Sequence, residues 1–305
     1  MDWGTSNVRA WLVDGNGNIL ASQKSGAGIT RVTDGDFQSA FSNLTGTMCT
    51  EAIPTLMSGM IGSRQGWVEA PYLLCPVFLD DLASGLITVP DAPQIKIVPG
   101  VHYVSPNGGH DVMRGEEVQI AGALQMNNAT DDQLICLPGT HSKWALIEAG
   151  KLTGYSTSMT GEVYAALSRH TILSALLPDE TSATEMSPEK SMTGFTRGLE
   201  RSADKGGLLH HLFGARANAL FDAIPTEDLR GYLSGMLIGH EIRAMLADYP
   251  ADLPITIVGD DNLAAHYAQA LTMLKRPATI VDAEKATLAG LQQILERSQS
   301  LQNGK

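Results

Sequence analysis

At two places in this chain, glycine followed by threonine stands directly before a pair of β-rich segments. Gly4-Thr5 precedes a hairpin pattern at 8–25, and Gly139-Thr140 precedes a second hairpin pattern at 144–155. An apolar run at 134–138 leads into the second copy. Because nearly half of the chain separates the two copies, the repeat predicts an internal duplication and two tandem domains.

The first copy contains residues that are suited to holding a phosphate group. Gly4 has no side chain, so backbone N–H groups can approach phosphate oxygens there, and Thr5 and Ser6 add hydroxyl donors. Asp2 is placed to meet a divalent cation through water. The alternative is an ordinary turn with local Asx and Ser/Thr hydrogen bonds. The repetition favours the phosphate hypothesis.

The second copy offers the same chemistry and adds a cation. Its candidate phosphate ligands are Gly139, Thr140, His141, Ser142 and Lys143. Lys143 either faces a phosphate or alternates outward on the following strand, and the sequence leaves both alternatives open. Two such hairpins, facing each other across a cleft, would hold the β- and γ-phosphates of a nucleotide from both sides.

The stretches around these motifs resemble a known superfamily. The chain is similar to the two-domain sugar kinases that share the ATPase fold of actin, hexokinase and Hsp70, and a closer resemblance is to the 2-dehydro-3-deoxygalactonokinases. The stretches that carry the resemblance are Asp-Trp-Gly-Thr-Ser-Asn (2–7), Ala-Gly-Ile-Thr-Arg (27–31), Ser-Gly-Met-Ile-Gly-Ser (58–63), Gly-Trp (66–67), Ala-Pro-Tyr (70–72), Val-Met-Arg-Gly-Glu-Glu (112–117), Leu-Pro-Gly-Thr-His-Ser-Lys-Trp (137–144) and Leu-Thr-Gly-Tyr-Ser-Thr-Ser-Met-Thr-Gly-Glu (152–162). The resemblance implies an α/β protein in which two RNase-H-like domains, of the actin and hexokinase ATPase type, flank a nucleotide cleft.

The resemblance also implies where the two domains lie. Residues 1–127 would form the first domain, with the first phosphate hairpin and the sugar site, and residues 128–305 the second, with the second hairpin and the adenosine site. A length of 305 residues suits two domains better than one core. Members of the family have an apolar strand that leads into the first aspartate. Only Met1 precedes Asp2 here, so we expect the chain to begin within that strand.

Gly259 and Asp260 are the candidate adenosine contacts. The short apolar strand at 255–258 runs into them, and a helix follows from Leu263. A helix N-terminus after a buried strand is a place where nucleotides bind. The superfamily has a glycine pair at this point, and this chain keeps only the first glycine of that pair.

An acidic cluster at the start of a helix predicted over 112–125 contains the candidate general base. In sugar kinases of this superfamily, a carboxylate at the start of the helix that closes the first domain removes the proton from the attacking hydroxyl. The resemblance therefore implies Glu116, with Glu117 and Asp111 as alternatives. The helix dipole also favours acidic residues in a first turn whatever their function, and this alternative stays open.

The sugar site is predicted at a polar loop bracketed by glycines. Gly62, Ser63 and Arg64 follow a buried strand, which is where open α/β sheets bind their ligands. A substrate that carries a carboxylate needs a cation, and Arg31 and Arg64 are the candidates. The alternative for Arg64 is a solvated cation of the loop.

The function that the resemblance implies is phosphorylation of 2-dehydro-3-deoxy-D-galactonate at its 6-hydroxyl, with ATP and Mg²⁺, in galactonate catabolism. The alternative substrates are other 2-keto-3-deoxy sugar acids or an anhydro-sugar. A different class is a nucleotide-switched binding protein, as actin and Hsp70 are on this fold. Such a protein needs a partner-binding domain after the core, and two domains already account for the 305 residues.

Composition narrows the partners and the compartment. A net charge of −12 argues against binding to nucleic acid or to an anionic membrane. The three cysteines, Cys49, Cys75 and Cys136, lie in apolar surroundings and are expected to be buried thiols in a reducing compartment. There is no apolar run of membrane-spanning length and no signal peptide, so we expect a cytoplasmic protein whose partners are ATP and a small sugar acid. The sequence does not decide the oligomeric state, and a homodimer stays open.

Overall fold

The computed structural model describes residues 1–48, 53–128, 131–178 and 188–303, in which the chain forms two compact units. Unit 1 comprises Met1–Asp132, Ala145–Tyr155 and Val281–Lys305, and unit 2 comprises Gln133–Trp144 and Ser156–Ile280. The two units are therefore not consecutive halves of the chain. The domain boundary after residue 127 stays a prediction.

Unit 1 contains three small sheets. Their strand orders are β1-β2-β3, β4-β7-β6 and β5-β8-β9. The strands are β1 (Asp2–Trp3), β2 (Val8–Val13), β3 (Ile19–Ser25), β4 (Thr55–Met57), β5 (Tyr72–Leu74), β6 (Ile87–Val89), β7 (Ala92–Ile97), β8 (Gly100–Val104) and β9 (His110–Met113). Asp2 also bridges Ser58 in parallel, just after β4, so β1 lies between the first hairpin and β4. This places the Asp2 motif at the centre of the unit, over a core that includes the buried side chains of Trp3 and Met57.

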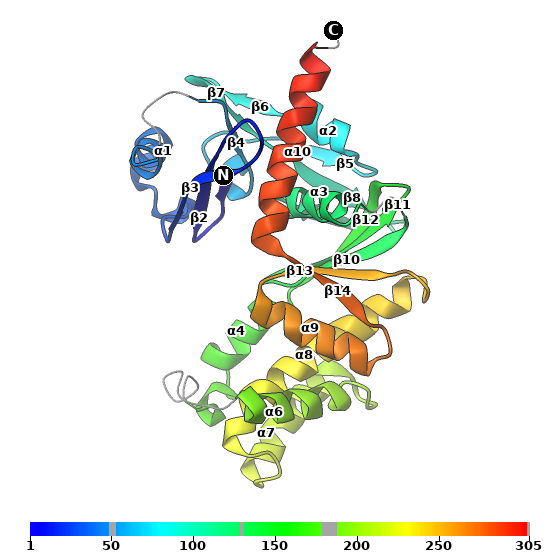
Figure 1. The fold of residues 1–305 in the computed structure, drawn as a ribbon. Helices are drawn as coiled ribbons and strands as arrows, with labels where there is room; N and C mark the ends of the chain where they lie inside the picture. Colours follow the sequence, from blue (N-terminus) through cyan, green and yellow to red (C-terminus); the bar gives the residue numbers. More distant parts are fainter. Residues whose placement is uncertain (49–52, 129–130, 179–187, 304–305) are drawn as a thin grey trace. The chain divides into compact units, whose positions relative to one another are not determined.

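Four helices accompany these sheets, and two of them touch through their backbones (Figure 1). They are α1 (Phe37–Thr45), α2 (Leu79–Ser84), α3 (Glu116–Met126) and α10 (Ala283–Asn303). A Cβ atom on Gly122 of α3 would lie 1.9 Å from the carbonyl oxygen of Ala286, and one on Gly290 of α10 would lie 2.0 Å from that of Val118. The C-terminal helix therefore packs on α3 only because both positions are glycine.

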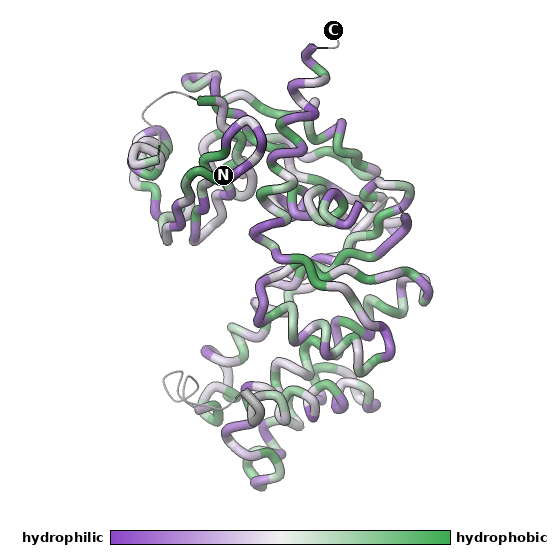
Figure 2. The backbone as a smooth tube through the Cα atoms, in the orientation of Figure 1, coloured by the Kyte–Doolittle hydropathy of each residue, from purple (hydrophilic) through white to green (hydrophobic). Residues whose placement is uncertain are grey.

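A five-stranded sheet repeats the strand order of the first part of the chain. Its order is β12-β11-β10-β13-β14, where β10 and β13 are parallel. The strands are β10 (Gln133–Leu137), β11 (Ser142–Glu148), β12 (Lys151–Ser158), β13 (Ile255–Gly259) and β14 (Ala278–Asp282). In both copies a hairpin pairs with the strand before it, which is joined in parallel by a later strand. All five residues of β13 are buried, and Figure 2 shows this strand as an apolar trace.

The remaining helices belong to unit 2. They are α4 (Thr160–His170), α6 (Pro188–Arg201), α7 (Gly207–Leu220), α8 (Leu229–Asp248) and α9 (Asp261–Met273). Short 3₁₀ turns occur at Ile29–Arg31, Thr33–Gly35, Met60–Gly62, Ser174–Leu176 and Thr226–Asp228. Helices α6 and α8 pack closely through glycine, since a Cβ atom on Gly235 would lie 2.0 Å from the carbonyl oxygen of Phe195.

The two predicted hairpins are confirmed, and two local predictions need correction. The helix predicted from residue 112 begins only at Glu116, because His110–Met113 form strand β9 in pairing with β8. Gly115 then takes a φ of 110°, which separates the strand from the helix. Cys136 is buried as expected, whereas Cys75 is only partly buried; Cys49 lies outside the described residues. Within the described ranges, no helix has the length and apolar character needed to cross a membrane.

Candidate active site

The first Gly-Thr turn is held in place by hydrogen bonds to its carbonyl groups. The amides of Gly28, Ile29 and Thr30 donate to the carbonyl oxygens of Ser6 (3.1 Å), Gly4 (3.0 Å) and Thr5 (3.3 Å) respectively. Thr5 and Ser6 are exposed, and their amide groups have no hydrogen-bond partner within the described part of the chain. The turn therefore presents free donors to solvent, as a phosphate site requires.

The glycines of the two turns are not required by the fold. A Cβ atom on Gly4 would come no closer than 3.5 Å to a protein atom, and one on Gly139 would meet nothing within 4 Å. By contrast, a Cβ atom on Gly28, behind the first turn, would lie 2.3 Å from the carbonyl oxygen of Thr5. Gly28 is explained by packing. At Gly4 a side chain would be tolerated in ordinary contact, and at Gly139 its absence leaves open space over the backbone, so a ligand can approach both turns.

The second turn divides into an exposed part and a buried part. Thr140 and His141 are exposed, and the His141 ring lies in hydrogen-bond contact with the carboxylate of Glu162. Ser142 and Lys143 are buried: the Ser142 hydroxyl lies 3.0 Å from that of Tyr267, and the Lys143 ammonium donates to the hydroxyl of Thr157 at 2.8 Å. Lys143 thus does not alternate outward into solvent, and its role toward phosphate stays a prediction.

A buried carboxylate lies beneath the second turn. Glu241 of α8 accepts hydrogen bonds from the Trp144 indole N–H at 2.8 Å and from the Tyr267 hydroxyl at 2.7 Å. Burial raises the pKa of Glu241, and hydrogen bonds from Thr160, Trp144, Tyr267 and Ser142 partly offset that rise. These bonds hold β11, α4 and α9 together around one group, so they fix the floor of the second turn.

Unit 2 also contains a cavity of about 1020 Å³ that brings Gly139 and Asp260 to one place. Tyr267 of the buried network and His266 also line it. Asp260 is the N-cap of α9, where its carboxylate accepts the amide of Leu263 at 3.1 Å. The residue that replaces the second glycine of the superfamily pair thus caps the helix. The cavity is large enough for a nucleoside.

In unit 1, two glycines bring Asp2 close to the acidic start of α3. A Cβ atom on Gly59 would lie 3.1 Å from Asp2 Oδ1, and one on Gly115 would lie 3.3 Å from the Cα atom of Gly59. Burial raises the pKa of Asp2, which the N-terminal amine and Arg9 partly offset. The candidate metal ligand and the candidate base therefore share one small region of the fold.

The three candidate bases have different surroundings. Glu116 is partly buried and accepts the amide of Arg114 at 3.0 Å. Glu117 is buried, and both its carboxylate oxygens lie within 2.8 Å of the Gly115 amide. Burial, with a smaller contribution from the charge of Glu116, raises the pKa of Glu117 to about 8. Asp111 lies on β9, where its carboxylate accepts the amide of Val112.

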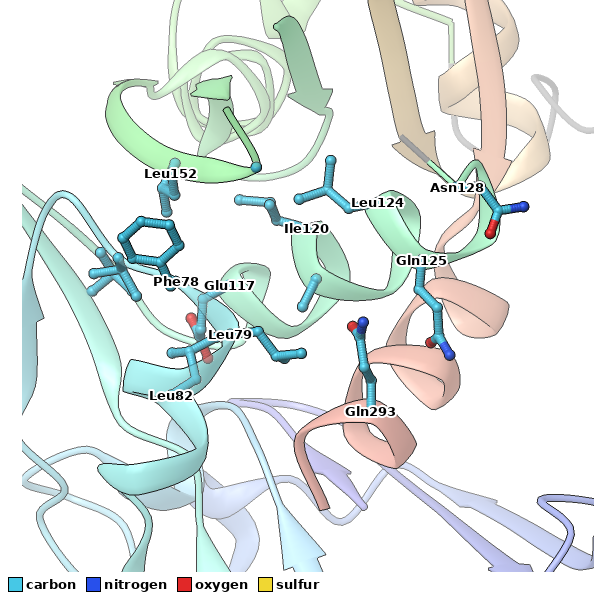
Figure 3. Close-up of a pocket in the computed structure, with 14 residues that line it drawn as sticks. Phe78, Leu79, Leu82, Glu117, Ile120, Leu124, Gln125, Asn128, Leu152 and Gln293 are labelled. Atoms are coloured by element: carbon cyan, nitrogen blue, oxygen red, sulfur yellow. The ribbon is translucent and has the colours of Figure 1, made fainter. Parts of the chain in front are cut away.

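Glu117 lines a cavity of unit 1 that the Gly4-Thr5 turn does not line. It lines a mostly apolar cavity of about 470 Å³ together with Leu82, Ile120 and Leu152 (Figure 3). A carboxyl group in such surroundings is stabilised in its neutral form. Glu117 is therefore less suited than Glu116 to accept a proton from a polar substrate.

Two polar side chains, one in the predicted sugar loop and one that lies against it, have buried groups without partners among the described residues. The hydroxyl of Ser63 is buried and unbonded in the described structure, whereas the Arg64 side chain is 88% exposed and lies 3.5 Å from Glu69. Arg31 is exposed as well. The second unsatisfied group is Arg114, which sequence reasoning did not single out. Arg114 shortly precedes the acidic pair Glu116 and Glu117. No short-range sequence pattern distinguishes a buried arginine from an exposed one.

Comparison with known proteins identifies the family. The model of the 2-keto-3-deoxy-galactonokinase family matches residues 2–294. The chain belongs to this family. Its sequence is 36% identical to 2-dehydro-3-deoxygalactonokinase of Escherichia coli (strain K12) over 295 residues, which cover 96% of each protein. The predicted family and enzyme class, a sugar-acid kinase, are therefore confirmed.

Solved structures confirm the fold of this 2-keto-3-deoxy-galactonokinase family member. A structure described as a 2-dehydro-3-deoxygalactonokinase protein from Sinorhizobium meliloti has a TM-score of 0.85 and 33% identity, covering 98% of this chain and 97% of the other. The activator of 2-hydroxyisocaproyl-CoA dehydratase from Clostridium difficile has a TM-score of 0.54 and 10% identity, covering 100% and 96% respectively. The second likeness shows the ATPase fold alone.

Proposed function

We propose that this protein transfers the γ-phosphoryl group of ATP to the 6-hydroxyl of 2-dehydro-3-deoxy-D-galactonate. Membership of the 2-keto-3-deoxy-galactonokinase family over residues 2–294 supports the reaction. The observation that carries the chemistry is the pair of Gly-Thr turns at Gly4 and Gly139, where no close protein contact requires the glycine. In phosphoryl transfer the protein contributes mainly positioning and charge stabilisation, and such turns supply both.

The nucleotide would be held by its two ends. Its phosphates would meet the turns Gly4-Thr5-Ser6 and Gly139-Thr140-His141, with Ser142 and Lys143 behind the second turn. Its adenosine would enter the cavity of unit 2 at Gly259 and Asp260. The capped start of α9 offers backbone N–H groups there, although Asp260 leaves less room than the superfamily's glycine pair.

Asp2 in unit 1 is the residue that fits a magnesium ion. No cluster of three or more His, Cys, Asp or Glu side chains suited to a metal occurs in the described residues. Mg²⁺ commonly uses one or two carboxylates with phosphate oxygens and water, so the partly buried carboxylate of Asp2 would fit as the protein ligand. When bound, Mg²⁺ would neutralise charge on the transferred phosphoryl group.

During the transfer, the protein would accept one proton from the substrate hydroxyl. The 6-hydroxyl oxygen forms the new P–O bond, the bond between the γ-phosphorus and the bridging oxygen of ADP breaks, and the hydroxyl proton passes to the carboxylate of Glu116. Glu116 is preferred because burial raises the pKa of Glu117 to about 8, so Glu117 mostly holds a proton at neutral pH before the reaction begins. Arg31, Gly62, Ser63 and Arg64 are proposed to surround the sugar acid.

A coupled assay of ADP release would test the proposal. The purified protein would be given ATP, Mg²⁺ and a panel of substrates: 2-dehydro-3-deoxy-D-galactonate, its C4 epimer, other 2-keto-3-deoxy acids and an anhydro-sugar. We expect the highest kcat/KM for the galactonate derivative, and a 6-phosphate product by NMR. A higher kcat/KM for another acid would change the proposed substrate, and no turnover of any acid would overturn the proposal. A homodimer and a cytoplasmic location also stay predictions, which light scattering and cell fractionation would measure.

A further inference from the structure

Arg114 places a buried positive charge next to the candidate base. The residue is 9% exposed, Nη2 donates to the carbonyl oxygen of Ala70 at 2.7 Å, and the guanidinium carbon lies 4.3 Å from the centre of the Tyr72 ring. Nε and Nη1 have no hydrogen-bond partner among the described residues. Because a guanidinium group has five N–H donors, most of its hydrogen-bonding capacity is unused.

The unused donors lie against the predicted sugar loop. A Cβ atom on Gly62 would lie 3.0 Å from Arg114 Nη1, so glycine there makes room for the guanidinium group. The next residue, Ser63, has a buried hydroxyl that also lacks a partner. Buried polar groups without partners destabilise a fold, most of all when they are charged, and are rare in native proteins. Arg114 lies against Gly62 and Ser63 follows Gly62 in the chain, so these two groups together indicate a missing partner.

We propose that Arg114, assisted by Ser63, binds the carboxylate of the sugar-acid substrate. This inference rests on the proposed function and adds the residues that recognise the acid. The missing partner must accept hydrogen bonds and carry negative charge, and a carboxylate does both with the planar geometry that matches a guanidinium group. The amide of Arg114 donates to the carboxylate of Glu116 at 3.0 Å, so this residue joins the proposed acid site to the candidate base.

Two other arginines compete for this role. Arg64 is largely exposed and already faces Glu69, and Arg31 is exposed. An exposed cation in water contributes little to binding an anion, whereas a buried one contributes much more. The other source of an anion is a nucleotide phosphate. The open turn at Gly4, with its exposed donors, serves that purpose better than a cation buried against Tyr72.

The first test needs no substitution. The kinetics of the wild-type protein would be measured with 2-dehydro-3-deoxy-D-galactonate and with its neutral methyl ester. We expect kcat/KM for the ester to be lower by roughly 10- to 100-fold, the usual size of a lost charged hydrogen bond. Equal values for acid and ester would overturn the inference. Turnover of the acid would still stand, so this failure is distinct from failure of the proposed function.

The second test locates the recognition. Arg114→Met and Ser63→Ala are expected to raise KM for the acid, by roughly 10- to 100-fold and by less than about 10-fold respectively. KM for ATP and for the ester should change little. Arg114→Lys should recover part of the affinity because it keeps the charge. Arg201→Met is the matched control, because Arg201 Nε is also buried without a partner, in unit 2.

Three outcomes would overturn the assignment. The first is a rise in KM for ATP instead of the acid, which indicates a phosphate contact. The second is loss of acid preference in Arg64→Met or Arg31→Met while Arg114→Met and Ser63→Ala retain it. The third is an unchanged preference in every variant, which leaves water as the partner of Arg114. Circular dichroism would verify the fold, and Ser63→Ala carries the test if Arg114→Met does not fold.

Discussion

Glu116 and Glu117 are adjacent in sequence but differ in burial and in the groups they contact. Successive helical residues point about 100° apart, and here one side chain is partly buried while the other lines an apolar cavity. We predict that Glu116→Gln lowers kcat by roughly 10²–10⁴-fold, the usual effect of losing a general base, with KM values little changed. Steady-state kinetics with saturating ATP would measure this effect.

Glu117→Gln and Asp111→Asn are the comparisons for that experiment. If Glu116→Gln stays active and either of the other variants is inactive, the base is misassigned. If all three variants remain active, the helix dipole alone explains the acidic cluster.

The pH dependence of stability tests the surroundings of Glu117. Its pKa is about 8 in the folded protein against 4.5 for the ordinary group. The folded form therefore holds the proton more tightly, and this stabilisation is complete below about pH 4.5 and is lost as the pH rises through about 8. Burial lowers the pKa of the N-terminal amine to about 5, which changes stability in the opposite direction over the same range.

Comparing the Tm of Glu117→Gln with that of the wild type cancels the effect of the N-terminal amine, because both proteins contain it. We predict that the Tm of Glu117→Gln, relative to the Tm of the wild type, rises between about pH 5 and about pH 9. The reason is that only the wild type has a buried carboxyl group at this position, and its ionisation destabilises the folded state. Thermal unfolding at several pH values would measure it. A constant difference would show that Glu117 is not buried as described.

At the scale of elements, the glycine contact between α3 and α10 decides where the candidate base lies. We predict that Gly290→Ala lowers Tm by several degrees, because its methyl group would lie 2.0 Å from the carbonyl oxygen of Val118 and must force the helices apart. Moving α3 would also lower kcat. Calorimetry and kinetics together would show both effects. Gly15→Ala is the control, since a Cβ atom there meets nothing within 4 Å, and it should leave Tm within about a degree.

If Gly290→Ala leaves Tm unchanged, the two helices are not in backbone contact. If Tm falls while kcat is normal, the contact supports stability without positioning the base.

At the scale of the whole molecule, turns from both units are predicted to contact one nucleotide. A ligand that binds only the native state raises Tm, so a non-hydrolysable ATP analogue with Mg²⁺ should stabilise the protein. We predict that Gly4→Ala and Gly139→Ala each abolish most of this rise and leave the Tm of the free protein nearly unchanged, because no protein atom lies close to the added methyl group. Differential scanning fluorimetry would measure both quantities.

Gly28→Ala separates this effect from damage to the fold. Its methyl group would collide with the backbone of Thr5, so it should lower the Tm of the free protein itself. A normal rise in Tm for either turn variant would remove that turn from the nucleotide site.

The sequence alone determined the features that depend on residues close together in the chain. The repeated Gly-Thr before a hairpin predicted both hairpins, since turn glycines and alternating β-rich segments act locally. The same short motifs carried the resemblance to the family, which the comparisons confirm. Asp260 as a helix cap is also a local effect, because a side chain bonds to an amide three residues later.

Only the tertiary structure decided the burial and the contacts between distant segments. Pairing of β8 with β9 moved the start of the predicted helix to Glu116. Lys143 and Arg114 look like surface cations in sequence, yet each is buried by strands and loops from elsewhere in the chain. Burial depends on packing over long sequence separations, which no local pattern records. For that reason the motif alone is enough to predict a phosphate site, whereas the residue proposed here to recognise the acid became visible only in the folded chain.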